Sequence, residues 1–387
     1  MTTVLDSQEI ITAAGFATGH FNVLDTGFTS RLQSFTGWLS LNGRLSAEQA
    51  LVARNQILQI VITRLDLAVD RRRIPAIADE KIERPIFVIG YSRTGTTLLQ
   101  SLLNTDPTIQ CPLWWHTHQP SPPPGEMPVA KGRFQAAQRE MDSWNQYTPG
   151  MLRMHPYWDD GNDALIEDEE IHTIDFQNAY PTLLFRVPAL AMMNLGDTAD
   201  PRGCYAFQKQ FMQHLQWSTP RRRWVVKGCA HQFQLKELFA EFPDAFCIWP
   251  HRDPVEVHQS TLAIASVLYH AVTNGNMNWK EFGPGYIKAA SAAIERVLTD
   301  PLVNDPRIIH LRFTELSRDP VGTVKGIYER GGLAYTAETE QRMRTWLDDP
   351  AHRSDRYGRY PYSLEPFGLR ADNVARTFAG YSKRFGV

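Results

Sequence analysis

The stretch that decides the fold is Pro85-Ile-Phe-Val-Ile-Gly90-Tyr-Ser-Arg-Thr-Gly95-Thr-Thr-Leu-Leu99. Its first half is a short apolar run with β-branched residues, which is typical of a buried parallel strand. Its second half opens a helix candidate at 95–104. A glycine-containing loop between a strand and a helix directs backbone N–H groups and the positive helix end toward one point. We therefore predict that this loop binds a phosphate-like anion.

Three more apolar runs, each followed by a helix candidate, extend the same pattern. The runs are 223–227, 245–250 and 307–313, and the helix candidates after them are 231–241, 255–271 and 320–330. This alternation predicts an α/β fold in which an open parallel sheet carries helices on both faces. In such sheets ligands bind at the carboxyl ends of the strands.

The chain outside these units is expected to be helical. Residues 1–83 predict a helical appendage with one long amphipathic helix from Ser46 to Arg73, which starts with a capping box formed by Ser46 and Gln49. Residues 84–387 predict the α/β domain. About 130 residues separate its first two predicted strands, too many for an ordinary crossover. Because residues 111–220 are rich in aromatic residues and methionine, we expect them to form a helical insertion that covers the acceptor side of the site.

Composition excludes several classes of protein. The 387 residues carry 40 Lys and Arg against 42 Asp and Glu, a net charge of −2, so no global field attracts nucleic acid. The sequence contains no run of about 18 apolar residues, the length that a transmembrane helix needs, so we expect no transmembrane segment. The four cysteines lie far apart without a CxxC pair, which argues against a zinc module and suits a reducing cytoplasm. We expect no metal, because His116 and His118 should point to opposite sides of a strand.

The glycine spacing resembles a nucleotide-binding motif with one substitution. Gly90 and Gly95 have the spacing of a Walker loop, GxxxxGK[ST], but Thr96 occupies the lysine position and Arg93 supplies a cation inside the loop. A P-loop nucleotide kinase or NTPase therefore lacks its phosphate-binding lysine here. That enzyme class and a non-catalytic nucleotide-binding protein remain the alternatives.

The loop also resembles the 5'-phosphosulfate loop, PRSGTT or PKSGTT, of sulfotransferases that use 3'-phosphoadenosine 5'-phosphosulfate (PAPS). This sequence has Tyr-Ser-Arg-Thr in place of Pro-Arg-Ser, and it keeps the cation and the Gly-Thr-Thr. The resemblance implies that PAPS is the co-substrate and that the loop binds its 5' end. The implied loop residues are Ser92, Arg93, Thr94, Gly95, Thr96 and Thr97.

Two further motifs support this resemblance. His251-Arg-Asp-Pro254 is followed by Ser260, eight residues after Arg252. In the family an arginine and a serine at this spacing bind the 3'-phosphate. Trp224-Val-Val-Lys227-Gly-Cys-Ala-His231 is similar to the family's WVLKSPAH stretch, in which the lysine contacts the bridging oxygen of the leaving group. The resemblance therefore implies transfer of a sulfuryl group from PAPS to a hydroxyl or amine of the acceptor, without a metal and with Arg93 and Lys227 neutralising the leaving phosphate.

The general base is a histidine in our prediction, because the pKa of histidine lies near working pH. We favour His116, in a Trp-Trp-His stretch where related sulfotransferases often carry Trp-Glu. His231, four residues after Lys227, is the second candidate, and Glu170, His172 or solvent follow. The aromatic insertion favours an apolar alcohol, phenol or lipid as the acceptor.

Overall fold

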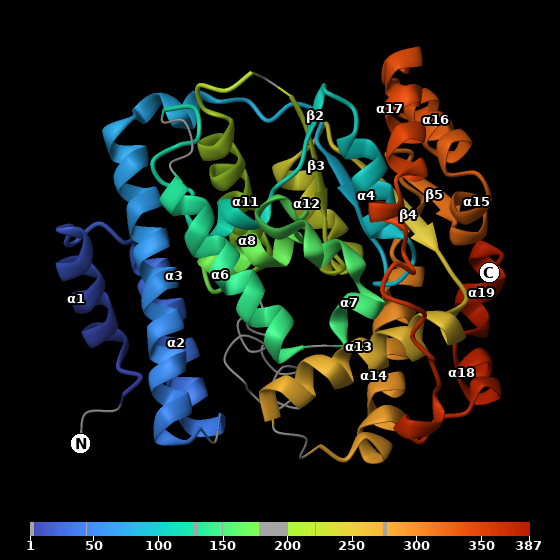
Figure 1. The fold of residues 1–387 in the computed structure, drawn as a ribbon, viewed down its shortest axis with the longest axis horizontal. Helices are drawn as coiled ribbons and strands as arrows, with labels where there is room; N and C mark the ends of the chain where they lie inside the picture. The colour runs from blue at the N-terminus through green and yellow to red at the C-terminus, as the bar shows by residue number, and fades with distance from the viewer. Residues whose placement is uncertain are drawn as a thin grey trace.

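The computed structural model describes residues 4–43, 45–126, 131–148, 150–177, 200–220, 222–273 and 277–387. Its centre is a five-stranded parallel sheet in the order β2-β3-β1-β4-β5 (Figure 1). The strands are β1 (Ile86–Val88), β2 (Ile109–Gln110), β3 (Arg223–Lys227), β4 (Phe246–His251) and β5 (Ile308–Arg312). The predicted open parallel sheet is confirmed, and all four apolar runs form strands. Only the two-residue β2 was not predicted.

Each predicted strand leads into a helix, as the alternation indicated. After β1 comes α4 (Thr96–Asn104); after β3 come η4 (Ala230–Phe233) and α12 (Leu235–Glu241); after β4 comes α13 (Pro254–Thr273); after β5 come α15 (Phe313–Arg318) and α16 (Pro320–Gly331). The register aligns Val88 with both Lys227 and Ile248. The residues that follow β3, β1 and β4 therefore meet at one edge of the sheet.

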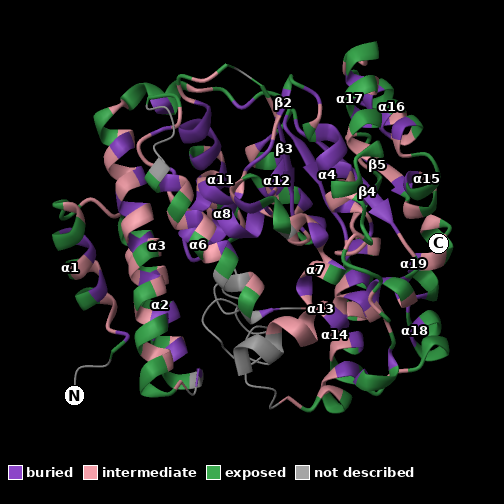
Figure 2. Cartoon of the chain, viewed as in Figure 1, coloured by how far each residue is buried: buried purple, intermediate pink, exposed green. Residues whose placement is uncertain are grey.

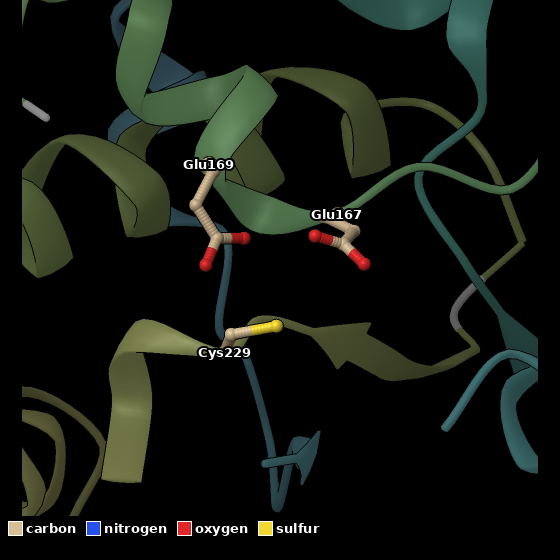
Figure 3. Close-up of side chains that lie close together, drawn as sticks. All are labelled: Glu167, Glu169 and Cys229. Atoms are coloured by element: carbon tan, nitrogen blue, oxygen red, sulfur yellow. The ribbon is translucent and has the colours of Figure 1, made fainter. Parts of the chain in front are cut away.

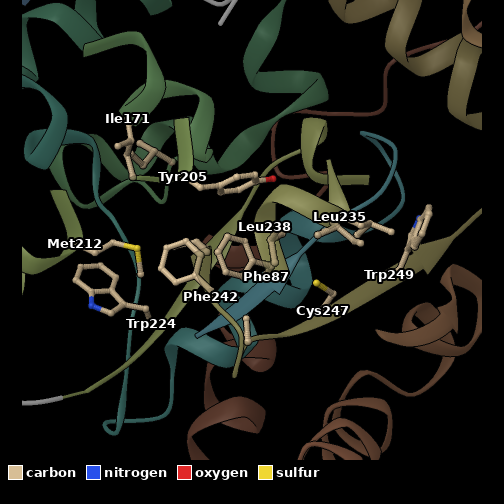
Figure 4. Packing of buried hydrophobic residues seen from close by; sticks show 14 of the residues in the cluster. Phe87, Ile171, Tyr205, Met212, Trp224, Leu235, Leu238, Phe242, Cys247 and Trp249 are labelled. Atoms are coloured by element: carbon tan, nitrogen blue, oxygen red, sulfur yellow. The ribbon is translucent and has the colours of Figure 1, made fainter. Parts of the chain in front are cut away.

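Helices cover both faces of the sheet, and the buried residues concentrate there (Figure 2). Phe87 points to one face, where it packs with Tyr205, Leu238 and Phe242 (Figure 4). Ile86 and Val88 point to the other face, which packs on α4, α16 and α17. Because side chains alternate along a strand, one apolar run supplies both cores.

The remaining described helices surround this centre. They are α1 (Ser7–Thr18), α2 (Thr26–Asn42), α3 (Ala47–Arg73), η1 (Pro75–Asp79), α5 (Trp114–His118), α6 (Lys131–Tyr147), α7 (Met151–Met154), η2 (Pro156–Asp163), α8 (Asp168–Ile174), α11 (Pro201–Gln216), α14 (Trp279–Thr299), η5 (Pro301–Asn304), α17 (Ala337–Asp348), η6 (Pro350–His352), η7 (Glu365–Phe367), α18 (Ala371–Thr377) and α19 (Ala379–Phe385). Part of the predicted insertion, residues 178–199, lies outside the described residues. Within the described ranges, no helix has both the length and the apolar character needed to cross a bilayer.

The N-terminal helices have a core of their own and a charged connection to the rest of the chain. Helix α3 starts with the predicted capping box of Ser46 and Gln49. Arg64 on α3 is buried, and its guanidinium contacts Asp175 (Nε to Oδ1, 2.7 Å) at the end of α8 and Asp25 (Nη2 to Oδ2, 2.8 Å). Arg31 on α2 also pairs with Asp175. Helices α1 to α3 lie at the edge of the molecule opposite the C-terminus (Figure 1), and these pairs connect them to α8.

Candidate active site

The loop between β1 and α4 has a backbone that only glycine tolerates at two positions. Gly90 has φ 106° and Gly95 has φ 89°, both in the left-handed region, and Arg93 between them has φ 70°. A Cβ on Gly90 would lie 2.5 Å from a ring carbon of Trp249, and one on Gly95 would lie 2.8 Å from a ring carbon of Phe313. Both glycines therefore permit a turn tight enough to direct the loop toward the start of α4.

Arg93 extends from this loop into a set of neutral partners. Its Nε donates to Ser260 Oγ (2.9 Å), and its Nη2 donates to the carbonyl of Met154 (2.8 Å) and to the hydroxyl of Tyr362 (3.3 Å). Burial lowers the pKa of Arg93, yet a guanidinium remains charged at neutral pH. A cation hydrogen-bonded to neutral groups keeps its charge available for an anion.

Arg252, the residue after β4, holds the same loop. Its Nη1 donates to the carbonyl of Arg93 (2.8 Å), its Nε donates to Glu256 Oε2 (2.7 Å), and its guanidinium lies 4.3 Å from the ring centre of Phe313. Arg252 thus contacts the backbone of Arg93, whereas Ser260 contacts its guanidinium, and the binding of a 3'-phosphate by Arg252 and Ser260 stays a prediction.

Lys227, the last residue of β3, reaches the loop from the other neighbouring strand. Its Nζ lies 3.3 Å from Thr97 Oγ1, on the first turn of α4, and 2.9 Å from Glu167 Oε1. The lysine side chain is 3% exposed, whereas that of Glu167 is 26% exposed. Lys227 at the end of β3, Arg93 after β1 and Arg252 after β4 thus meet at one loop. This arrangement of cations suits a polyanionic ligand.

The other predicted loop residues have more local contacts. Ser92 Oγ lies 2.8 Å from Cys229 Sγ, and Thr94 Oγ1 donates to the carbonyl of Tyr91 (2.7 Å). Thr96 is buried at the start of α4. These contacts fix the shape of the loop, and the roles of Ser92, Thr94 and Thr96 toward a donor stay predictions.

The N-terminal end of α8 contacts the end of β3 and the residues after it, through Glu167, Asp168 and Glu169, which the sequence did not indicate as site residues. Besides the ion pair of Glu167, Glu169 Oε1 accepts a hydrogen bond from the Ala230 backbone N–H (3.1 Å), and Asp168 Oδ2 lies 2.8 Å from His231 Nε2. The sequence signal was the run from Glu167 to Glu170. Acidic residues also favour any helix N-terminus, so this run alone did not indicate a site.

Glu167, Glu169 and Cys229 face one another, with their possible ligand atoms within 4.8 Å (Figure 3). Burial raises the pKa of Glu169 to about 7 and raises that of Cys229 well above its ordinary value. The sulfur is therefore a thiol at neutral pH, whereas metal ions bind the thiolate. The carboxylate of Glu167 is in addition paired with the ammonium of Lys227.

A family model described as the sulfotransferase family matches residues 85–337, the segment that contains this loop and all three cations. The chain belongs to the sulfotransferase family. The resemblance inferred from the loop and the two later motifs is thereby confirmed at the level of the family.

Relatives agree with this assignment. The sulfotransferase is 28% identical, over 280 residues, to omega-hydroxy-beta-dihydromenaquinone-9 sulfotransferase Stf3 of Mycobacterium bovis, a match that covers 69% of this chain and 67% of that protein. Its fold is similar to the crystal structure of sulfotransferase STF9 from Mycobacterium avium, with a TM-score of 0.85, 26% identity and coverage of 100% and 98%. Sulfotransferase STF1 from Mycobacterium tuberculosis shares the fold, with a TM-score of 0.77, 22% identity and coverage of 98% and 100%.

His231 of the sulfotransferase lies in a buried polar network. Its Nε2 lies 2.8 Å from Asp168 Oδ2 and its Nδ1 lies 2.8 Å from the Tyr205 hydroxyl, and the His231 and Tyr205 rings stack. Gln208 Nε2 donates to the same Asp168 oxygen (2.7 Å). Both ring nitrogens of His231 thus have buried partners, an arrangement that fixes the ring in place.

His116 lies on α5, so the expectation that it and His118 flank a strand is wrong. Leu113 donates its backbone N–H to His116 Nδ1 (3.0 Å), and this side chain-to-backbone contact starts the helix. Burial, together with His214, lowers the pKa of His116 to about 3. Within the described ranges, the hydrogen bonds of His116 do not reach the anion loop. Its catalytic role stays a prediction.

His155, which follows α7, is a site neighbour that no sequence motif indicated. Its Nε2 lies 3.5 Å from Thr97 Oγ1. Burial, with the charges of Lys227 and Arg93, lowers the pKa of His155 well below its ordinary value. The ring is therefore neutral at neutral pH, and it adds no charge to the cations around the loop.

Proposed function

We propose that this sulfotransferase moves a sulfuryl group from PAPS to the hydroxyl of an apolar, lipid-like acceptor. The observation that carries the proposal is the convergence of Arg93, Lys227 and Arg252 on one glycine-shaped loop. PAPS carries two separate anionic groups, and the cations lie on different sides of the loop. The family assignment supports the same donor.

The site residues divide between the two ends of the donor. In this proposal Lys227, Arg93 and the backbone N–H groups of the loop hold the 5'-phosphosulfate, while Arg252 and Ser260 hold the 3'-phosphate. The 2.9 Å contact from Arg93 to Ser260 makes the two subsites adjacent. Bidentate guanidinium groups suit phosphate oxygens, and a serine hydroxyl adds a neutral donor.

The chemistry requires positioning and charge neutralisation. The acceptor oxygen forms a bond to sulfur while the bond from sulfur to the 5'-phosphate oxygen breaks, and the electron pair leaves with the phosphate. Lys227 and Arg93 neutralise this developing charge from fixed positions, which accelerates transfer because the cations need not reorganise. Nothing is oxidised or reduced. In this proposal the cations of the protein neutralise the charge that Mg²⁺ neutralises in phosphoryl transfer.

An apolar acceptor is supported by the side chains next to Arg93. Met154, whose carbonyl binds Arg93, packs with Met151 and Ala263 in a small apolar cluster. Partly buried residues complete this cluster: Ile264, Val267, Leu268, Tyr360 and Tyr362. The Stf3 relative is a sulfotransferase of omega-hydroxy-beta-dihydromenaquinone-9, a hydroxylated menaquinone derivative. We also infer a cytoplasmic location, because all four cysteines are free thiols.

The test uses donor labelled with ³⁵S and three acceptors, namely farnesol, 2-naphthol and N-acetylglucosamine, with products identified by mass. We expect transfer to farnesol, less to the phenol and least to the sugar, with no effect of a chelator. Absence of labelled product with all three acceptors would contradict the proposal. Hydrolysis of ATP that depends on Mg²⁺ would instead favour an NTPase.

A further inference from the structure

The carboxylate of Glu167 combines contact with the leaving-group lysine and access to solvent. Its Oε1 lies 2.9 Å from Lys227 Nζ, and the same Nζ lies 3.3 Å from Thr97 in the anion loop. One ammonium therefore separates Glu167 from the loop where the donor is proposed to bind. A group that takes a proton from the acceptor needs this proximity.

Glu167, the N-cap residue of α8, is also more exposed than the carboxylates of the first turn that follows it. Asp168 is fully buried beside His231, and Glu169 is buried with one oxygen on the Ala230 N–H. The Glu167 side chain is 26% exposed. An acceptor hydroxyl can reach only a group that it can approach, so exposure distinguishes Glu167 from its two neighbours.

We propose that Glu167 is the general base of this sulfotransferase, positioned for the acceptor hydroxyl by its ion pair with Lys227. The inference rests on the proposed function, since it assigns the proton of that reaction. It names a different residue from His116, which the sequence favours.

The step balances without a further reactant. The acceptor O–H bond breaks and its proton goes to a carboxylate oxygen of Glu167, while the acceptor oxygen bonds to sulfur and the 5'-phosphate leaves with the electron pair. Lys227 has three N–H donors, and the hydrogen bonds above use two of them. The third can meet the leaving phosphate while the other two keep Glu167 and the loop in place. Glu167 then releases its proton to solvent.

Groups from several elements set the charge around Glu167. They are Lys227 at the end of β3, Cys229 after it, Arg93 in the anion loop, and Glu169 and Glu170 on α8 itself. Two of these groups are cations and two are carboxyl groups, and all of them influence the charge of Glu167. The dependence of the transfer rate on pH therefore has to be compared between wild type and Glu167 variants.

The experiment replaces the carboxylate by its amide. Glu167→Gln should lower the single-turnover rate of farnesol sulfation at pH 7.5 by about a hundredfold or more. It should also remove the fall in rate at acid pH, while calorimetric affinity for 3'-phosphoadenosine 5'-phosphate (PAP) stays within about threefold of wild type, since a proton acceptor adds little to ground-state binding. Glu167→Asp keeps the carboxylate and should recover part of the rate together with the acid fall. That recovery separates chemistry from misfolding.

Glu241→Gln is the matched control. Glu241 Oε1 also lies 2.9 Å from a lysine, Lys209 Nζ, and its side chain is 30% exposed, but it lies on α12 outside the site. This variant should keep the wild-type rate and profile.

The remaining outcomes separate the two proposals. A wild-type protein that transfers nothing from PAPS would reject the proposed function, and the inference with it. An active wild type whose Glu167→Gln variant keeps its rate would overturn the inference alone. So would an equal loss of rate and PAP affinity, which would make Glu167 only an anchor for Lys227. A hundredfold loss in His116→Ala, with Glu167→Gln unaffected, would return the role to His116.

Discussion

Arg252→Ala should remove most of the preference of this sulfotransferase for a nucleotide that carries a 3'-phosphate. Arg252 follows β4, and its guanidinium contacts Glu256, the Arg93 carbonyl and the Phe313 ring. In the proposed site it binds the 3'-phosphate of PAP, a group that AMP lacks. The substitution should therefore weaken PAP binding and leave AMP binding nearly unchanged.

The expected size follows from the partners of Arg252. A charge-assisted hydrogen bond contributes about 1.5–3 kcal/mol. The pair with Glu256, in which the side chains are 24% and 48% exposed, is partly exchanged when the phosphate binds, and such a pair contributes about 0–1 kcal/mol. The net loss is therefore about 0.5–3 kcal/mol, roughly a 2- to 150-fold weaker affinity for PAP.

Calorimetric titration of the wild type and the variant with PAP and with AMP measures this difference. Glu256→Gln is the complementary variant, because it releases Arg252 from its ion pair and should keep or raise the affinity for PAP. If Arg252→Ala weakens both nucleotides equally, the residue acts by holding the Arg93 carbonyl and the shape of the loop. That result would refute its assignment to the 3'-phosphate.

Three more substitutions test the loop, the leaving-group cation and the buried histidine. Gly95→Ala should lower the free energy of unfolding by about 2–5 kcal/mol, because the φ of Gly95 is 89° and the new Cβ would lie 2.8 Å from a ring carbon of Phe313. The control Gly37→Ala, on α2 with no atom near the new Cβ, should raise the free energy of unfolding by about 0.5–1 kcal/mol. Urea denaturation measures both changes. Lys227→Ala should lower single-turnover rate about a hundredfold or more and PAP affinity far less; equal losses would make Lys227 a ground-state binding residue. His231→Ala should cost about 2–4 kcal/mol of unfolding free energy by removing a buried ring and the partner of Asp168, and a thermal or urea transition like that of wild type would contradict this.

The parts of the fold that follow from local pattern were predictable. The run from Pro85 to Gly90 predicts a strand because it is apolar and short. The segment after β4 predicts a helix because proline is well tolerated at the first helical position, where Pro254 lies. The capping box of Ser46 and Gln49 is a contact within one turn, so residue identity determined it. Strand β2 has two residues, too few for a periodicity to appear in the sequence.

The parts of the site that depend on tertiary contacts were not predictable. Glu167 meets Lys227 across 60 residues of chain, and Tyr362 meets Arg93 across 269. The sequence around Glu167 and around Tyr362 contains no motif that predicts these two contacts. His116 and His118 were expected to point to opposite sides of a strand, whereas the His116 ring accepts the Leu113 N–H at the start of a helix.

Helix α8 contacts both the candidate active site and the N-terminal helices, and this limits where the chain can be truncated. Its N-terminal end contacts the end of β3 and the residues after it, and Asp175 at its C-terminal end pairs with Arg31 and Arg64 of the N-terminal helices. A shortened chain that begins at residue 84 would keep every anion-loop residue and lose both guanidinium groups. Breaking a buried ion pair by removing one partner costs about 3–5 kcal/mol. The match to the family model begins at residue 85, so it starts after both arginines, and trimming the protein to that boundary would weaken the helix that carries Glu167.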